Sequence, residues 1–386
     1  EEALVDYKVH QSIVNNNLKG IKKDYGMFFT PERIVDFMVN LIDITKYTDK
    51  KDISILEPAC GLAQFLVGIR RNQPTLSKQA KLFGVEVNQN IINYLTTVNI
   101  GSNIKIIRAD YLLWEPESSF DLVIGNPPYG IPSLSKHYTI KIDPITKEKY
   151  KSRYETWYGK YNVYGAFIEK SIKLLPPEGQ LIFIVPPTFM ILDEFKKLRT
   201  FLSKNGGTAI IYLGPDVFKP EADVSSVVLN FLKSDKFVSR LELLEYRDNK
   251  INTIKVNSHW QGEVAKFETD YTRTLESICS YRLGDIYEIR ISPRTPEIKH
   301  NPYITRKANG NNYLPLLNGR NLKCHRIIYD NLTGYWIKKS DIKNLRGYFS
   351  TPHIVVGHGF RENGKVGAAY DKKCYPWMGD VYHLLP

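Results

Sequence analysis

Residues 120–129 read FDLVIGNPPY, a short apolar run followed by a stiff polar loop that ends in an aromatic residue. The apolar run predicts a buried strand. Two consecutive prolines end it, because each fixes φ and removes a backbone N–H donor. This loop can therefore offer only carbonyl oxygens and flanking side chains to whatever lies against it, which suits a group that has hydrogens to donate.

Asn126, Pro127 and Tyr129 form a candidate catalytic set for a planar amine such as N6 of adenine. The lone pair of such an amine is delocalised into the ring, so the nitrogen must be rehybridised before it attacks a methyl group. The Asn126 side-chain oxygen and the Pro127 carbonyl can accept its two hydrogens. Tyr129 can stack on the base, which is worth roughly 1–3 kcal/mol. The alternative is an ordinary strand-to-loop turn in which Tyr129 packs on the core.

Upstream, residues 53–56 form a short apolar strand that turns through Glu57-Pro58-Ala59-Cys60-Gly61 into a helix expected to begin near Leu62. Small residues in such a turn let the backbone approach a nucleoside. The full G-x-G-x-x-G pattern that would cradle a pyrophosphate is absent. S-adenosylmethionine contains adenine and ribose but no phosphate, so it fits this turn better than a dinucleotide.

Carboxylates follow two further expected strands. The strand at 82–87 reaches Glu86 about 25 residues after the glycine turn, the spacing at which a carboxylate meets ribose hydroxyls. The strand at 104–108 is followed by Asp110, which can accept from an adenine amino group, and by Tyr111, which can flank the ring. Each acidic residue alone is more often a helix cap or turn residue. Several in register predict a doubly wound, Rossmann-like α/β domain that binds S-adenosylmethionine.

The alternation of elements continues on both sides of these strands. Thr30 and Pro31 occupy expected N-cap and N1 positions before an amphipathic helical pattern at 32–42. Downstream, residues 161–167 open another helix, and residues 180–186 form a buried strand after a Pro-Pro-Glu-Gly turn.

In this order of motifs the chain resembles the γ-class adenine-N6 DNA methyltransferases, and within them the TaqI-type modification methyltransferases. The resemblance rests on Thr30-Pro31, Glu57 to Gly61, Glu86, Asp110, Asn126 to Tyr129 and Tyr161 to Phe167. It extends through Tyr212-Leu213-Gly214, Val217-Phe218, Gly319 to Leu322, Thr351-Pro352-His353, Tyr375-Pro376-Trp377 and His383 to Pro386. One departure lies at Gly61-Leu62-Ala63, where many members have a second glycine.

The resemblance implies roles for individual residues. It implies that the cofactor S-adenosylmethionine is bound by Thr30, Glu57, Ala59, Cys60, Gly61, Glu86, Asp110, Tyr111, Pro128 and Phe167. The implied catalytic residues are Asn126, Pro127, Tyr129 and Phe218, the last two against a flipped adenine. No metal is implied. The implied activity is site-specific methylation of adenine N6 in duplex DNA, as the modification half of a restriction-modification system.

Charge favours a polyanionic partner. The chain has 53 Lys and Arg against 41 Asp and Glu, and residues 260–386 alone carry a net charge of +7. A basic cluster interleaved with aromatic residues also follows the catalytic loop. We expect DNA contacts from Lys136, Lys141, Lys149, Lys151, Arg153, Arg294, Arg306, Arg320 and Arg361, with plain surface charge as the alternative for each.

The length favours two domains, a catalytic domain at 1–250 and a mixed, irregular DNA-recognition domain at 260–386 that is incomplete at its C-terminus. No run of 18 apolar residues or signal peptide is present, so we expect a cytoplasmic protein without membrane contact. Four scattered cysteines indicate neither a zinc ribbon nor a disulfide framework. We expect a monomer, partnered in the cell by a cognate restriction endonuclease.

Three other functions remain open at this stage. The amide of a protein glutamine is also planar and suits an Asn-Pro-Pro-Tyr loop. The chain could instead be a DNA specificity protein on a silent scaffold, or one module of a fused restriction-modification enzyme. Two weaker signals are set aside: residues 359–365 resemble a P-loop but lack its Ser or Thr, and His353 and His358 point to opposite faces of an expected strand.

Overall fold

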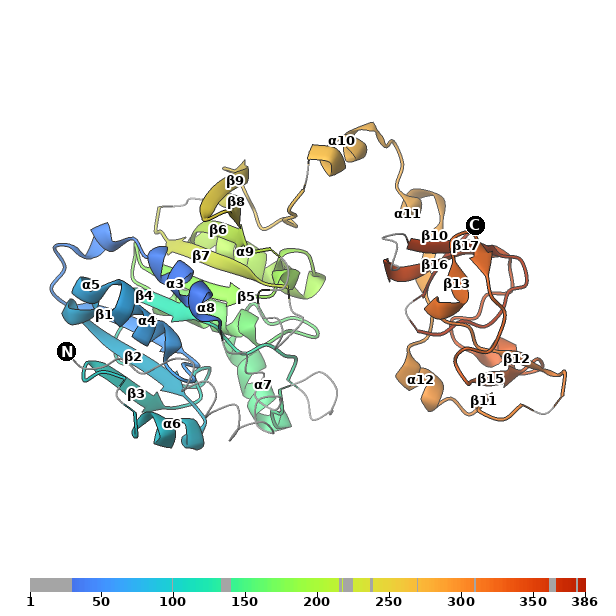
Figure 1. The fold of residues 1–386 in the computed structure, drawn as a ribbon, viewed down its shortest axis with the longest axis horizontal. Coiled ribbons are helices and arrows are strands. Elements are labelled where there is room, and N and C mark those ends of the chain that lie inside the picture. Colours follow the sequence, from blue (N-terminus) through green and yellow to red (C-terminus); the bar gives the residue numbers. More distant parts are fainter. Residues whose placement is uncertain are drawn as a thin grey trace. The chain divides into compact units, whose positions relative to one another are not determined.

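The computed structural model describes residues 30–98, 100–132, 140–214, 217, 225–236, 239–268, 270–308, 310–360, 366–379 and 381–386. The chain forms two compact units, residues 1–268 and 269–386 (Figure 1). The sequence placed the change between 250 and 260. The first unit extends further because Trp260 and Ala265 are buried in its hydrophobic core.

A nine-stranded sheet organises the described part of the first unit, in the order β3-β2-β1-β4-β5-β7-β6-β8-β9. The five strands from β3 to β5 are parallel, whereas β7 runs antiparallel to both β5 and β6. The strands are β1 Ile53–Pro58, β2 Ala80–Glu86, β3 Ile104–Arg108, β4 Leu122–Gly125, β5 Gln180–Val185, β6 Gly206–Tyr212, β7 Val227–Lys233, β8 Leu241–Arg247 and β9 Lys250–Asn257.

Helices cover both faces of this sheet because alternate residues of its central strands point to opposite sides. Val123 and Phe183 pack with residues of α8 and α9, while Leu122 and Ile184 pack with residues of α3 and α4. The described helices are α3 Glu32–Asn40, α4 Gln64–Asn72, α5 Pro74–Gln79, α6 Gln89–Leu95, α7 Pro144–Arg153, α8 Tyr164–Leu174 and α9 Lys196–Asn205. The doubly wound α/β domain expected from the sequence is confirmed.

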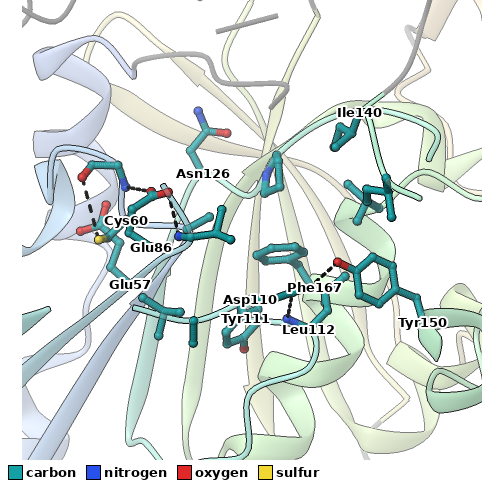
Figure 2. Close-up of a pocket in the computed structure, with 18 of the residues that line it drawn as sticks. Glu57, Cys60, Glu86, Asp110, Tyr111, Leu112, Asn126, Ile140, Tyr150 and Phe167 are labelled. Carbon is teal, nitrogen blue, oxygen red and sulfur yellow. Dashed lines mark hydrogen bonds between the residues drawn. The ribbon is translucent and has the colours of Figure 1, made fainter. Parts of the chain in front are cut away.

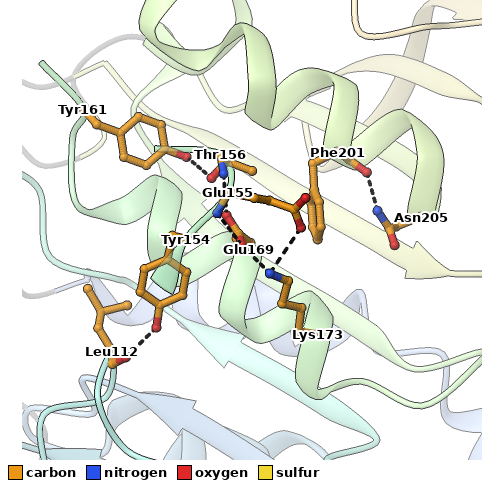
Figure 3. A network of polar contacts seen from close by, with 9 residues as sticks. All are labelled: Leu112, Tyr154, Glu155, Thr156, Tyr161, Glu169, Lys173, Phe201 and Asn205. Carbon is orange, nitrogen blue, oxygen red and sulfur yellow. Dashed lines mark hydrogen bonds and ion pairs between the residues drawn. The ribbon is translucent and has the colours of Figure 1, made fainter. Parts of the chain in front are cut away.

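A buried carboxylate fixes the segment that joins α7 to α8. Glu169 in α8 is fully buried, accepts hydrogen bonds from the backbone N–H groups of Glu155 (3.1 Å) and Thr156 (2.9 Å), and pairs with Lys173 (Figure 3). Within this network the Tyr154 hydroxyl donates to the Leu112 carbonyl. The segment after α7 is thereby held against the loop that follows β3.

The second unit is mixed and largely irregular, with two small hydrophobic clusters around Trp377 and Ile337. Its described strands form sheets in the orders β10-β18-β16-β17, β11-β15-β12 and β13-β14. Their bounds are β10 Glu288–Ile291, β11 Ile304–Thr305, β12 Tyr313–Pro315, β13 Leu322–Lys323, β14 Arg326–Ile327, β15 Trp336–Lys338, β16 His353–Phe360, β17 Val366–Asp371 and β18 Val381–Leu385, with helices α10 Asp270–Ile278, α11 Leu283–Ile286 and α12 Thr295–Lys299.

Most elements expected in the first unit are confirmed, with shifts of a few residues at their ends. One expectation about capping is wrong: Pro31 occupies the N-cap position of α3, and no side chain in the described part of the chain caps this helix. The Thr30 hydroxyl is instead used in the site described below. In β16, His353 is buried and His358 is exposed, as their spacing predicted. No helix among the described residues is long and apolar enough to span a membrane.

Candidate active site

A pocket of about 290 Å³ lies at the carboxyl ends of the parallel strands β1, β2, β3 and β4, near the lower end of the size range of small-molecule sites. All ten residues expected to bind the cofactor line it: Thr30, Glu57, Ala59, Cys60, Gly61, Glu86, Asp110, Tyr111, Pro128 and Phe167. Figure 2 shows Glu57, Cys60 and Glu86 on one side of the pocket and Asp110, Phe167 and Tyr150 on the other.

Glu86, at the end of β2, is held by three backbone donors. One carboxylate oxygen accepts from Gly61 N (2.9 Å) and the other from Val87 N (2.9 Å) and Asn88 N (2.8 Å). Burial nevertheless raises the pKa of Glu86 above its usual value. These bonds fix the carboxylate in place and leave its remaining lone pairs for vicinal hydroxyl groups, so the arrangement fits a ribose.

The turn between β1 and α4 has an unusual backbone. Ala59, Gly61 and Ala63 have φ values of 52°, 51° and 57°, in the left-handed region that favours glycine. Ala63 stands where the sequence departs from the family pattern, and it adopts this conformation without glycine. Alternating conformations of this kind bring successive backbone N–H groups toward one side of a turn. The turn is thus shaped for close approach to a ligand.

Glu57, at the end of β1, is buried beside this turn. Its carboxylate accepts hydrogen bonds from Phe65 N (3.4 Å) and Leu66 N (3.1 Å) at the start of α4. Burial raises the pKa of Glu57 to about 8, against the opposing effect of these two bonds. A cation placed in the pocket would favour the ionised form of this group.

Asp110, Tyr111 and Phe167 form the other side of the pocket. The ring centroids of Tyr111 and Phe167 lie 4.9 Å apart, and the Tyr111 hydroxyl is bonded to Ser171 (2.9 Å). The Asp110 carboxylate accepts from Leu112 N (3.0 Å) and from the Tyr150 hydroxyl in α7 (2.7 Å) (Figure 2). Flat apolar walls beside a fixed acceptor suit a purine that carries an amino group.

Asn126, directly after β4, also lines the pocket. Its side-chain Nδ2 donates to the Thr30 hydroxyl (3.1 Å), although the two residues lie 96 positions apart. The backbone N–H of Thr30 in turn donates to the Gln64 side-chain Oε1 (3.2 Å). Because the amide nitrogen of Asn126 faces Thr30, the amide oxygen is directed away from it. This orientation leaves the oxygen on the side from which an amine could be bound.

Two of the other three residues of the Asn-Pro-Pro-Tyr loop are buried. Pro127 is buried and Pro128 lines the pocket. The Tyr129 side chain is 9% exposed, its hydroxyl donates to the Ile184 carbonyl (2.8 Å), and its ring meets Tyr164 edge to face. Tyr129 does not line the described pocket. Contact with a base would therefore involve its ring and not its hydroxyl, and that role stays a prediction.

The basic cluster that follows the catalytic loop is divided between the pocket, the protein itself and the surface. Lys141 lines the pocket, and Lys149 is exposed on α7. Lys151 pairs with Glu148, and Arg153 pairs with Glu115. Among the aromatic residues interleaved with this cluster, Tyr150, Tyr154 and Trp157 are buried, and Tyr158 is 55% exposed.

Three of the arginines predicted to contact DNA lie in the described part of the second unit, and all three are exposed. Arg306 donates to the Tyr335 hydroxyl (3.0 Å), and Arg320 donates to the Leu332 carbonyl. Arg294 lies at the N-cap position of α12, and its side chain is exposed. Lys136, Phe218 and Arg361 lie outside the described residues. The DNA contacts predicted for all of these positions stay predictions.

Among the pocket residues that were not foreseen from the sequence, Gln64 and Tyr150 form polar contacts with predicted site residues. Gln64 lines the pocket from the first position of α4, and Tyr150 lines it from α7. Gln64 stands at the start of a helix beside the glycine turn, and this position could have predicted that it lines the pocket. No local signal distinguished Tyr150 from its aromatic neighbours, because its partner Asp110 lies 40 residues away.

The fold and the pocket together define an S-adenosylmethionine-dependent methyltransferase. The model of the Eco57I restriction-modification methylase family matches residues 42–218, and that of the TaqI-like C-terminal specificity domain matches residues 314–386. The type II methyltransferase M.TthHB8I of Thermus thermophilus is 39% identical over 94% of this chain and 81% of its own length. The chain therefore belongs to the type II DNA methyltransferases of restriction-modification systems, which confirms the resemblance drawn from the sequence.

Other relatives match over a smaller share of their length. The type II methyltransferase M.BstVI of Geobacillus stearothermophilus is 29% identical over 47% of this chain and 37% of its own. A cryo-electron microscopy structure of a DrdV–DNA complex has 15% identity and a TM-score of 0.61, and covers 99% of this chain and 52% of its own. The last comparison shows a shared fold.

Proposed function

We propose that this methyltransferase transfers its methyl group to N6 of an adenine that is flipped out of duplex DNA at a specific site. The observation that carries the proposal is the position of Asn126, which follows β4, lines the cofactor pocket and has its amide oriented by Thr30. S-adenosylmethionine supplies a methyl group that is already activated as a sulfonium. The chain's own task is then to orient and prepare the amine.

The loop at 126–129 carries acceptors for that amine. Pro127 and Pro128 have no backbone N–H, so the loop presents no competing donor at these two positions. The Asn126 amide oxygen and the Pro127 carbonyl would each accept one hydrogen of the amine, which draws its lone pair out of conjugation with the ring. A nitrogen prepared in this way can attack the methyl carbon directly, with no covalent enzyme intermediate. The carbon–sulfur bond breaks as the carbon–nitrogen bond forms, and the products are N6-methyladenine, S-adenosylhomocysteine and a proton.

Base flipping follows from where these acceptors lie. An adenine in duplex DNA is stacked and paired, so its N6 cannot reach a pocket at the end of β4 until the nucleotide leaves the stack, at a cost of a few kcal/mol. Stacking on the Tyr129 ring would offset part of this cost. Phe218, predicted to act beside Tyr129, lies outside the described residues.

The remaining residue roles are proposals of the same kind. Glu86 would bind the ribose hydroxyls, Asp110 the adenine amino group of the cofactor, and Tyr111 and Phe167 the faces of its ring. Lys149, exposed on α7, would neutralise a DNA phosphate. The match of residues 314–386 to a specificity domain supports DNA, and not a protein glutamine, as the substrate.

The decisive experiment is product identification. The purified chain is incubated with labelled S-adenosylmethionine and mixed-sequence duplex DNA, the DNA is digested, and the methylated nucleoside is identified by mass spectrometry. We expect N6-methyladenine. A methylated cytosine, or labelled protein with unlabelled DNA, would reject the proposal.

Asn126→Ala tests the catalytic role in the same assay. We expect at least about 100-fold slower transfer, because an acceptor used in the transition state is lost, with cofactor affinity changed less than about threefold. Asn252→Ala, on the exposed strand β9, is the matched control and should retain full activity. Full turnover by Asn126→Ala would remove Asn126 from the mechanism.

A further inference from the structure

Gln64 carries a buried hydrogen-bond donor that finds no acceptor among the described residues. The residue lies at the first position of α4, lines the cofactor pocket and is 9% exposed. Its Oε1 accepts from Thr30 N (3.2 Å), which fixes the amide plane. Its Nε2 is shielded from solvent and has no hydrogen-bond partner within the described part of the chain.

A buried amide N–H₂ without an acceptor is costly, because the group loses its hydrogen bonds to water and gains none in return. Native proteins rarely leave such groups unsatisfied. Gln64 therefore points to a ligand that brings an oxygen acceptor to this end of the pocket. A lone pair on a neutral oxygen would satisfy it, and a carboxylate oxygen would bind it more strongly.

The layout of the pocket selects one part of the cofactor. The acceptor Asp110 and the rings of Tyr111 and Phe167 suit the adenine, and Glu86 suits the ribose. These groups come from β2, β3 and α8, whereas Gln64 is bonded to the residue that precedes α3. The part of S-adenosylmethionine left for this end is the amino-acid portion, whose only acceptor is its α-carboxylate.

We propose that Gln64 is a cofactor-binding residue whose Nε2 donates to the α-carboxylate of the methionine portion of S-adenosylmethionine. The inference rests on the proposed placement of the adenine and ribose, and not on which DNA base is methylated. Thr30 connects this donor to the reaction, since its N–H binds Gln64 and its hydroxyl accepts from Asn126. Binding of the carboxylate to Gln64 would therefore also fix the position of Thr30, which orients the Asn126 amide.

A double-mutant cycle between protein and ligand tests this. Binding is measured by calorimetry, without DNA, for S-adenosylmethionine and for its decarboxylated analogue, which lacks only the carboxylate. Gln64→Met removes the donor while keeping a side chain of similar size. It should lower the affinity for S-adenosylmethionine about tenfold or more, which is the effect of losing a hydrogen bond to a charged group. The same substitution should change the affinity for the decarboxylated analogue by less than about twofold.

Gln64→Glu is the second variant. This variant keeps an oxygen that can accept from Thr30 N and replaces the donor with an acceptor. It should therefore also lower the affinity for S-adenosylmethionine more than the affinity for the decarboxylated analogue. Gln79→Met, exposed at the end of α5, is the control and should change neither affinity. Thermal unfolding of each variant shows whether its fold is intact.

The proposal is overturned if either folded variant lowers the affinity for both ligands equally, or lowers the affinity for neither ligand. The buried amide would then have a structural role or be hydrogen-bonded to water. It is also overturned without any variant if the wild-type chain binds S-adenosylmethionine and the decarboxylated analogue with equal affinity. Because DNA is absent from every measurement, failure of the proposed adenine specificity would leave these outcomes unchanged.

Discussion

The cofactor side and the transfer side of the pocket are held in different ways. On the cofactor side, Glu57 and Glu86 accept five backbone N–H bonds from residues nearby along the chain or in the turn that follows the adjoining strand β1. On the transfer side, the Asn126 amide donates to the side chain of Thr30, 96 positions away. The first arrangement uses backbone donors, whereas the second includes a contact between side chains from distant segments, so point substitutions should affect the two sides differently.

After Asn126 itself, the largest effect should come from Thr30 on the transfer side. Thr30→Val keeps the shape but removes the oxygen that accepts from Asn126, so the amide can turn away from the amine. We expect kcat to fall about 30-fold, and cofactor affinity to fall by less than this, because a lost hydrogen bond near a reacting group costs about 2 kcal/mol. Thr30→Ser keeps the oxygen and should restore most of the rate. Equal rates for the valine and serine variants would contradict the orienting role.

On the cofactor side, the pH dependence of binding should reveal Glu57. Burial raises the pKa of Glu57 to about 8, so the carboxyl is neutral at pH 6 in the free protein. A bound sulfonium cation favours the ionised form, so affinity for S-adenosylmethionine should rise about tenfold from pH 6 to pH 9. Since the folded-state pKa lies above the usual 4.5, this group's contribution to stability is present below about pH 4.5 and is lost as pH rises toward 8.

S-adenosylhomocysteine is the matched control for this prediction, because it has the same amino-acid portion without the positive sulfur. The ratio of the two affinities should increase with pH in the wild-type chain and stay level in Glu57→Gln. A ratio independent of pH in the wild-type chain would show that Glu57 does not sense the sulfonium.

Two glycines offer a steric comparison between the sides. A Cβ on Gly84, in β2, would lie 2.8 Å from Cys60 Sγ and 2.8 Å from Ile106 Cδ1, whereas a Cβ on Gly125, in β4, would meet nothing closer than 3.6 Å. Gly84→Ala should therefore displace the turn that carries Cys60 and destabilise the fold by about 1 kcal/mol. Gly125→Ala should change the free energy of unfolding by less than about 0.5 kcal/mol. Denaturant unfolding of both variants checks this, and equal midpoints would contradict it.

The difference between local backbone contacts and contacts of distant side chains also explains which features could be predicted from the sequence. The strand ends that carry Glu57, Glu86 and Asp110 were predicted because apolar runs, turn residues and their spacing are local signals. The capping role of Thr30 was predicted wrongly, because a local pattern cannot show that Asn126 competes for its hydroxyl.

The second unit was harder to predict because its strands are short and its clusters small. Trp377 and Ile337 are buried in separate clusters built from distant segments, and most of its strands pair over only a few residues. Periodicity needs longer elements than these to be informative. The mixed, irregular character was foreseen from composition, but its sheets were not.

The smallest effect should arise where the two sides meet, at Tyr150. Its hydroxyl donates to Asp110 on the cofactor side, while its helix α7 also carries the exposed Lys149. Tyr150→Phe removes one hydrogen bond to a carboxylate that keeps a second donor, Leu112 N, so we expect S-adenosylmethionine to bind about three- to fivefold more weakly. Tyr158→Phe, at an exposed ring, is the control. A change in kcat with unaltered cofactor affinity would contradict this expectation. Tyr150, and with it this part of α7, would then belong to the transfer side.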